Sequence, residues 1–215
     1  MLSSIQPLGE RSRGNRFTTT ATAFFLGATA GGATTGLVLW TIGFGGRALV
    51  HLVSGPRLSG PAPAEPIFVA ILGIVGVIAL TADWIGRPLP SLPRQVNEAW
   101  LTTYRGWVYG VGFGFQLGLG VVTFITAPAT WMWLAALALS PSWSSAVLIG
   151  AVFGGIRGIS VYTTYGVSHP AALTHYHQVL NTHFSRFNTA SRVVLALVSI
   201  GALLSTPMAT SFTAV

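Results

Sequence analysis

The sequence predicts an all-α protein, a polytopic bundle with about five to seven transmembrane segments. Hydrophobic residues make up 51% of the 215-residue chain and charged residues only 7%, whereas a soluble domain carries about 25% charged residues. Residues 107–126 form a run without one formal charge, long enough for a helix to cross a bilayer core. Within this run Gly110, Gly114 and Gly118 recur every fourth residue, which gives the helix a smooth ridge that a second helix can approach closely.

Charge and cysteine content exclude several classes of function. The net charge of +7 comes from arginine, because the chain contains no lysine. The arginines lie mostly at the ends of apolar segments and not in a polar, aromatic patch, so we expect no nucleic-acid partner. The absence of cysteine excludes disulfides and thiol redox chemistry carried by this chain. With four acidic residues and no phosphate-binding loop or GxSxG motif, we expect neither an enzyme nor a bound cofactor.

The first half of the chain contains two predicted spans. A polar segment over residues 1–16, expected to be mobile or interfacial, precedes an apolar run over residues 17–42. This run is too long for the apolar region of a signal peptide, so we interpret it as a retained first transmembrane helix. Residues 47–53 are too short to span, which favours an interfacial or re-entrant helix. Residues 67–85 form the second span, and a proline-containing loop over residues 87–105 follows.

The second half begins with the glycine-rich run and is interrupted by proline. Pro128 ends the helix, and the short apolar segment over residues 131–140 is typical of a half-helix or an interfacial piece. Residues 146–165 form another span. Residues 169–192 are predicted to be a polar loop, which contains four of the five histidines, and an apolar last helix follows it.

The two halves are alike in plan, which suggests a two-fold internal repeat within one transmembrane domain over residues 17–208. Each half has a glycine-rich helix, a short helical piece, a second long helix and a polar loop with proline. Repeats of this kind are common in transporters. The predicted units are residues 17–100, residues 101–190, a last helix over residues 191–208 and a short tail over residues 209–215.

The distribution of arginine favours a multi-pass protein of the cell membrane with a cytoplasmic N-terminus. If the short pieces over residues 47–53 and 131–140 do not span, most of the arginines lie on one side of the membrane, and the positive-inside rule assigns that side to the cytoplasm. If each short piece spans, the two repeats are inverted and the loop over residues 87–105 lies outside. Both arrangements stay open.

Arg157 is the most informative candidate for a ligand contact. It lies near the middle of the span over residues 146–165, where a cation costs about 2.5–3.5 kcal/mol on insertion scales and normally faces a partner, a wet cavity or a ligand. Three neighbouring glycines leave space for another group to approach. The sequence is equally compatible with an anion or polar-substrate contact and with a structural pair to Asp83 or to backbone carbonyls.

Four further polar residues fall within or beside the spans. Asp83 at the end of its helix is either an interfacial carboxylate near Arg87 or a site for a coupling ion or a proton. Gln116 lies among glycines and needs a hydrogen-bond partner, which is either a neighbouring helix or a ligand. Thr34 and Thr35 can satisfy their hydroxyl groups on the backbone of their own helix, so a structural role competes with a substrate contact.

The stretch SHPAALTHYHQVLNTH is rich in histidine. Its His169, His175 and His177 are candidate metal ligands, because imidazole is a common ligand of transition metals. The stretch has no HExxH signature and no nearby Cys, Asp or Glu that would complete a set. A solvated or headgroup-facing loop therefore competes with a metal site.

The stretches FFLGATAGGATTG and YGVGFGFQLGLG open the two halves. With the helices that follow, this plan resembles the transmembrane domain of the DsbD and CcdA thiol-electron carriers and the LysE-like exporters, over about residues 17–205. The resemblance implies a transporter scaffold, or a relative of such a scaffold that serves as an accessory subunit. In the electron carriers each such helix carries a Cys, usually next to Pro. The corresponding stretches here contain Thr34, Thr35, Gln116 and Gly118, and this difference removes the thiol chemistry.

These observations lead to two hypotheses about function. The first is a transporter of a small solute or ion, with its site between the two glycine-rich helices and the helix that carries Arg157. The second is a non-catalytic accessory subunit of a larger membrane complex that binds lipid or pigment, which the seven Trp and twelve Phe residues favour. The expected partners are the lipid bilayer and either further copies of the chain or other membrane subunits.

Overall fold

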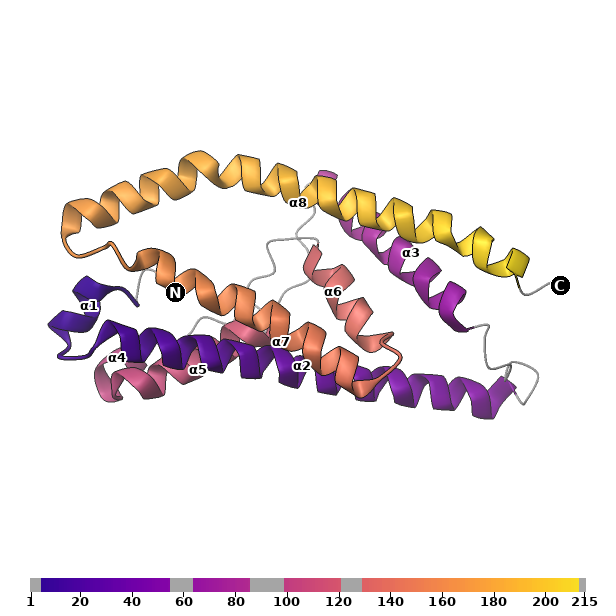
Figure 1. Ribbon diagram of the computed structural model, residues 1–215, viewed down its shortest axis with the longest axis horizontal. Coiled ribbons are helices and arrows are strands. Elements are labelled where there is room, and N and C mark those ends of the chain that lie inside the picture. Colours follow the sequence, from indigo (N-terminus) through magenta and orange to yellow (C-terminus); the bar gives the residue numbers. More distant parts are fainter. Residues whose placement is uncertain (1–4, 55–63, 86–98, 121–128, 213–215) are drawn as a thin grey trace.

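The computed structural model describes residues 5–54, 64–85, 99–120 and 129–212, and every regular element in these ranges is a helix (Figure 1). The all-α class is confirmed for this part of the chain. In chain order the elements are α1 (Pro7–Ser12), α2 (Phe17–Ser54), α3 (Ala64–Trp84), α4 (Trp100–Thr103), α5 (Gly106–Leu119), α6 (Ala129–Ala138), α7 (Trp143–Ile159), the 3₁₀ helix η3 (Ser160–Thr164) and α8 (Pro170–Phe212).

Helix α2 lies between α5 and α7 (Figure 1). Two pairs of glycines on α2 allow the close contact. A Cβ atom added at Gly27 or Gly31 would overlap backbone carbonyl oxygens of α5, and one added at Gly32 or Gly36 would overlap carbonyl oxygens of α7. Only glycine permits helix backbones to approach this closely. Helix α2 therefore presents a separate glycine face to each neighbour.

The two neighbours meet α2 with glycines of their own. On α5, Gly110, Gly114 and Gly118 lie against carbonyl oxygens of α2, and on α7 Gly150 and Gly154 do the same. Glycine has no side-chain rotamers to lose, so these contacts cost little side-chain entropy. The three helices form one unit held by backbone contact.

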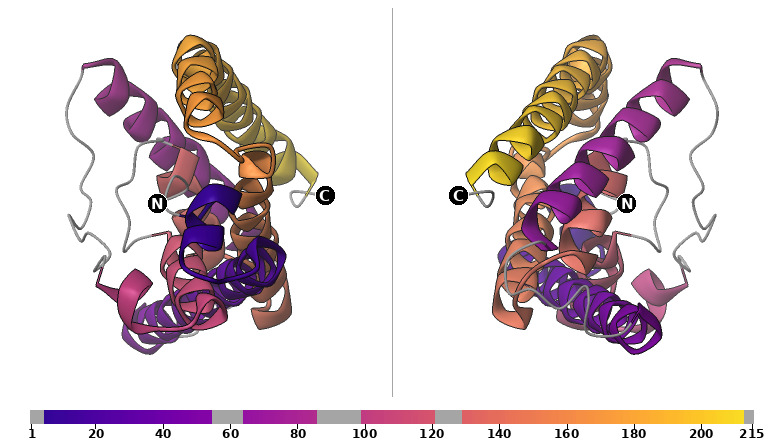
Figure 2. Two further views of the ribbon diagram at one scale, coloured as in Figure 1. Left: turned by 90° about the vertical axis from the view of Figure 1, so that its left-hand side faces the viewer. Right: turned by 90° about the vertical axis from the view of Figure 1, so that its right-hand side faces the viewer.

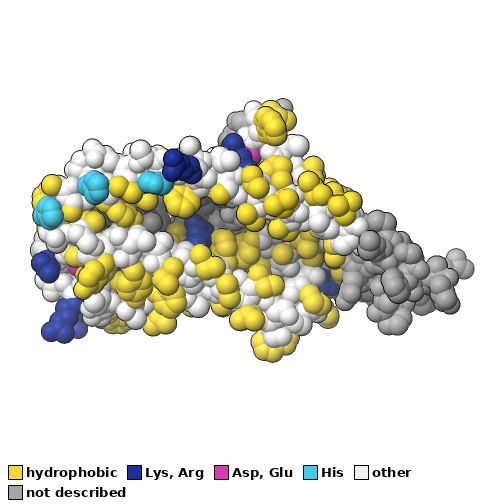
Figure 3. Space-filling model, turned by 45° about the horizontal axis from the view of Figure 1, so that its top comes forward, with side chains coloured by type: hydrophobic (Ala, Val, Ile, Leu, Met, Phe, Trp, Pro, Cys, Tyr) yellow, Lys and Arg dark blue, Asp and Glu magenta, His cyan; other side chains and the backbone are white. Residues whose placement is uncertain are grey.

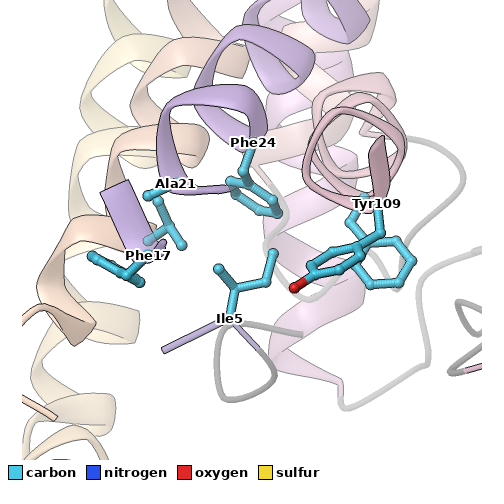
Figure 4. Close-up of a cluster of buried hydrophobic side chains, with 7 residues drawn as sticks. Ile5, Phe17, Ala21, Phe24 and Tyr109 are labelled. Atoms are coloured by element: carbon cyan, nitrogen blue, oxygen red, sulfur yellow. The ribbon is translucent and has the colours of Figure 1, made fainter. Parts of the chain in front are cut away.

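The amino-terminal segment packs into one end of this unit. A hydrogen bond of 3.3 Å runs from the N–H of Leu8 to the carbonyl oxygen of Val167, and the Thr164 hydroxyl donates to the carbonyl oxygen of Ile5 at 3.2 Å. These two bonds join the start of the amino-terminal segment to η3 and to the turn that follows it. The expectation that residues 1–16 are mobile or interfacial stays a prediction. The buried cluster around Ile5, shown in Figure 4, consists of Ile5, Phe17, Ala21, Phe24, Tyr109, Phe113 and Val161.

Helix α2 continues without a break to Ser54, so the separate short helix predicted over residues 47–53 is wrong. No proline interrupts this stretch, and its glycines keep a negative φ. The Nη1 atom of Arg47 donates to the carbonyl oxygen of Ala138 at 2.9 Å. A cation is favourable at the C-terminal end of a helix, so this contact stabilises the end of α2 against α6.

Helix α8 runs continuously over Pro170–Phe212, so the polar loop predicted over residues 169–192 is wrong. The first part of α8 is polar, which suggested a loop. It can still form a helix, because no glycine or proline occurs between residues 171 and 200. The proline that precedes this stretch stands at the first helical position, where its missing N–H costs nothing. Thr182 donates its hydroxyl to the carbonyl oxygen of Gln178 at 2.6 Å, which shows how such polar side chains are satisfied along a helix.

The second half of α8 packs against α3, and this pair lies beside the α2–α5–α7 unit (Figures 1 and 2). Gly73 and Gly76 of α3 lie next to Leu203 and Ser199 of α8, respectively. Helix α6 contacts both α2 and α3, so it connects the pair to the three-helix unit.

Helix α5 is shorter than the predicted span over residues 107–126. It ends at Leu119, and Gly120 follows with a φ of 71°, a positive value that glycine adopts more readily than other residues. Residues 121–126 lie outside the described residues. The 14 residues of α5 measure about 21 Å, which is less than the ~30 Å thickness of a bilayer core. If α5 begins at the membrane surface, it ends within the bilayer.

In the part of the chain that the structure describes, three helices are long and apolar enough to cross a membrane: Phe17–Leu49, Trp143–Thr164 and Pro170–Ser205. Two shorter apolar helices accompany them, Phe68–Trp84 and Ala129–Ala138. Large hydrophobic side chains are exposed over much of the face in Figure 3, and extensive apolar surface of this kind is typical of membrane contact. The fold is compatible with an integral membrane protein. Five to seven spans, an internal repeat and the orientation stay predictions.

Candidate functional site

Helix α7 brings Arg157 against the three-helix unit. The helix begins after Ser142, whose Oγ accepts the N–H of Ser145 at 3.1 Å and so satisfies one of the free donors of the first turn. On either side of Arg157, Gly154 and Gly158 hold α7 close to α2. The side chain of Arg157 is partly buried as a result.

Arg157 belongs to a stack of side chains that we call the Arg157 column: Trp133 on α6, with Phe153 and Arg157 on α7. The guanidinium carbon lies 5.4 Å from the centroid of the Phe153 ring, which is within cation–π range. The Phe153 ring in turn stacks on Trp133, with 3.8 Å between the ring centroids and 19° between the planes. The column therefore joins α6 and α7.

The C-terminal end of α5 lies against the same column. A Cβ atom added at Gly120 would lie 2.9 Å from Cζ3 of Trp133 and 3.4 Å from Cε1 of Phe153. Thr35 of α2 donates its hydroxyl to the carbonyl oxygen of Leu119 at 3.0 Å. The C-terminal end of a helix carries a partial negative charge, and here it lies against the aromatic stack that carries a cation.

Two of the five predicted ligand residues, Arg157 and Thr35, lie around this end of α5. Thr34 is exposed, and its hydroxyl donates to the carbonyl oxygen of Ala30 at 2.9 Å. Gln116 lies about 200° around the helix axis from Gly114, and Gly114 contacts α2. Gln116 therefore faces away from α2 and does not line this contact.

Asp83, the fifth predicted ligand residue, lies on α3 and pairs with α8. The Nε atom of Arg192 donates to Oδ2 of Asp83 at 2.5 Å. Among the described residues, the ion pair of Asp83 is made with Arg192 and not with Arg157. The other partner that the sequence suggests, Arg87, lies outside the described residues.

The three predicted metal ligands do not form a cluster. His169 precedes α8, whereas His175 and His177 lie on α8, about 200° apart around its axis. In the described ranges no group of three or more His, Cys, Asp or Glu side chains could hold a metal ion. The His183 ring nitrogen Nδ1 lies 2.9 Å from the carbonyl oxygen of Val179, so this histidine contacts its own helix.

Comparison with known proteins gives a negative result. No protein-family model, characterised protein or solved structure matches the chain. The candidate site is therefore judged on its geometry alone. The resemblance to thiol-electron carriers and LysE-like exporters stays a prediction.

Glu10 is the buried polar residue that sequence reasoning missed. The side chain is fully buried, and the Tyr109 hydroxyl lies 2.6 Å from both carboxylate oxygens. The Thr20 hydroxyl donates at 2.8 Å and the Arg13 guanidinium at 2.7 Å. Burial, the largest single influence, would lower the pKa of Arg13, but the hydrogen bonds and charges of Glu10 and Tyr109 together outweigh it and the pKa is raised. The network ties the amino-terminal segment to α2 and α5.

One feature of the sequence could have indicated this network. Glu10 is the only acidic residue in the first 16 residues, and three arginines follow it within six residues. A glycine follows at position 14, and its φ of 72° turns the chain back from α1 into α2. A lone carboxylate among arginines before a glycine turn is a pattern of local charge pairing, although its burial depends on Tyr109, which is distant in sequence.

Proposed function

We propose that this protein is a small multi-pass transporter of the cell membrane and that the Arg157 column lines its path for a small anionic solute. The observation that carries the proposal is a partly buried cation within a candidate spanning helix, in a side-chain stack whose Trp133 and Phe153 lie against the end of α5. Cations at membrane depth normally face a partner, a wet cavity or a ligand. Helices that end within the membrane form binding sites in many secondary transporters.

The column offers two kinds of donor to an anion. The guanidinium of Arg157 has five N–H donors in a planar fork that fits carboxylate and phosphate oxygens, so it can contact an anion in addition to a protein partner. The indole Nε1 of Trp133 is buried and has no hydrogen-bond partner among the described residues. An unpaired buried donor costs about 1–3 kcal/mol, so a bound anion that accepts this N–H would recover part of that free energy.

Transport by purified protein tests the proposal. In proteoliposomes, uptake of labelled chloride, sulfate, phosphate, acetate and glutamate is measured under an inward gradient of each anion. We expect uptake of at least one anion, and we expect Arg157→Gln to lower that uptake about ten- to a hundredfold, the effect of losing a charge-assisted contact. Arg11→Gln, at an exposed position on α1, is the matched control. Equal uptake by the Arg157→Gln variant, or no uptake of any anion by the wild type, would contradict the proposal.

The first half of α8 favours a second candidate, an accessory subunit of a membrane complex. Leu180, Phe184 and Phe187 recur at helical spacing on one face, and the two phenylalanines are 66% and 69% exposed. An amphipathic helix with an uncovered apolar face is suited to a membrane surface or to another subunit. Gentle extraction from the native membrane, followed by mass spectrometry and an absorption spectrum, distinguishes the two candidates. Stoichiometric protein partners or a bound chromophore would favour the subunit.

A further inference from the structure

The ion pair between Asp83 and Arg192 lies where the apolar parts of two helices end. The apolar part of α3 covers Phe68–Trp84, so Asp83 stands at its last turn. On α8, an apolar stretch begins directly after Arg192. The two helices run antiparallel, because Gly76 lies next to Ser199 and Gly73 next to Leu203. The ion pair therefore marks one level along both helices, the boundary between apolar and polar chain.

A cavity of about 530 Å³ opens at this level. Its lining combines apolar side chains with the ion pair and an indole, and the lining residues are Leu80, Asp83, Trp84, Arg192, Val193 and Ala196. The indole of Trp84 is 86% exposed. Tryptophan prefers the interface between hydrocarbon and headgroups, which is consistent with the level that the ion pair marks.

Both charges remain accessible from this cavity. The side chains of Arg192 and Asp83 are 44% and 19% exposed. The bond to Asp83 uses Nε, and a guanidinium has four further N–H donors on its two Nη atoms. A partly exposed ion pair contributes little to stability, so its position in the wall of a cavity suggests a role in binding.

We infer that this cavity binds the headgroup of a zwitterionic phospholipid. The phosphate lies against the Arg192 guanidinium and the ammonium group against the Asp83 carboxylate, with the Trp84 ring offering a cation–π contact. The acyl chains follow the apolar wall of Leu80, Val193 and Ala196. A ligand with one anionic and one cationic group matches the ion pair, whereas a purely anionic headgroup would meet the carboxylate as well. The inference is independent of the proposed transport function.

Lipid retention measured by native mass spectrometry tests this assignment. The purified, delipidated full chain is incubated with phosphatidylethanolamine or phosphatidylglycerol of identical acyl chains. We expect the wild type to bind phosphatidylethanolamine about tenfold more tightly, the effect of one charge-assisted contact. The Asp83→Asn variant should lose this preference, and Arg192→Gln should bind both lipids more weakly. The Arg186→Gln variant, at an exposed position of the same helix, should behave as the wild type.

Two further measurements keep the test decisive if loss of the ion pair impairs folding. The Ala196→Phe variant keeps both charges and fills the apolar wall, so it should bind neither lipid tightly. Soluble phosphoethanolamine has the same charges without acyl chains, and we expect it to compete only weakly with the lipid. Equal affinity of the wild type for the two lipids would overturn the inference. Competition by phosphoethanolamine at the lipid's own concentration would also overturn it, because the ligand would then be a soluble zwitterion.

Discussion

The carboxylate of Glu10 shows how much a single side chain can contribute to this fold. It accepts hydrogen bonds from Tyr109, Thr20 and Arg13 in a site without exposure to solvent. Removing one member of a buried charged network leaves its partners without compensation. We expect Glu10→Ala to lower the free energy of unfolding by about 3–5 kcal/mol, measured by chemical denaturation in detergent.

The controls separate the charge of Glu10 from its packing. Glu10→Gln keeps the shape and one acceptor oxygen, so its cost should be smaller than that of Glu10→Ala. Arg11→Gln, at an exposed position one residue away, should change the free energy of unfolding by less than about 0.5 kcal/mol. A Glu10→Ala variant as stable as Arg11→Gln would show that the network contributes nothing.

Adjacent threonines on α2 provide a second comparison between single residues. The buried Thr35 hydroxyl lies within hydrogen-bond distance of the Gly31 carbonyl oxygen on its own helix and of Leu119 on α5. The exposed Thr34 hydroxyl bonds only within α2. Valine has nearly the same shape as threonine, so Thr35→Val should lower the free energy of unfolding by about 0.5–1.5 kcal/mol. Thr34→Val should leave it almost unchanged, and equal effects would contradict the assigned link between α2 and α5.

At the scale of elements, the glycine contacts predict that alanine has different effects on the free energy of unfolding at two positions. A Cβ atom at Gly114 would overlap the carbonyl oxygen of Phe24, whereas a Cβ atom at Gly45 would meet nothing within 4 Å. Gly114→Ala should therefore force α2 and α5 apart and cost about 1–3 kcal/mol. Gly45→Ala should be neutral or stabilise α2 by up to about 1 kcal/mol, because alanine favours a helix. Thermal unfolding of both variants measures the difference, and equal shifts would contradict the close contact.

Some of the helices can be predicted from the sequence and others cannot. The all-α class follows from composition and from long apolar runs without charge. The first half of α8 was predicted as a loop because its polar residues suggested solvent, although the absence of glycine and proline over residues 171–200 permits a helix. The sequence does not predict the continuity of α2 beyond residue 42, because residues 47–53 form an apolar stretch too short to span and so favour a separate helix. Composition indicates where a segment lies more reliably than whether it stays helical.

The candidate sites are formed by contacts between residues on different helices, and the sequence alone does not show how these helices pack. Arg157 was found because a cation in an apolar helix is unusual, but its stack with Phe153 and Trp133 depends on where α6 packs. The Asp83–Arg192 pair joins residues 109 positions apart, and Arg192 had been assigned to a loop. The predicted metal ligands are not brought together, because His175 and His177 lie on different faces of a helix, whereas a strand would place them on the same face.

At the scale of the whole molecule, the helices form two groups of unequal packing. Helices α2, α5 and α7 are in backbone contact, whereas α3 and α8 contact each other and reach the rest mainly through α6. The first half of α8 lies beyond α3, and the Tyr176 hydroxyl meets the Thr163 hydroxyl at 2.8 Å. Segments with few buried contacts open locally at lower free energy than a packed core.

Hydrogen exchange measured in lipid nanodiscs tests this difference in packing. We expect backbone amides over residues 172–190 to exchange faster than those over residues 20–36, where glycine contacts bury α2 on two sides. Residues 193–203 of α8, which pack on α3, provide the internal control and should exchange slowly. Uniform protection along all of α8 would contradict an open first half. It would mean that lipid, another copy or another subunit covers the face with Phe184 and Phe187, because an uncovered helix of this composition has no other source of protection.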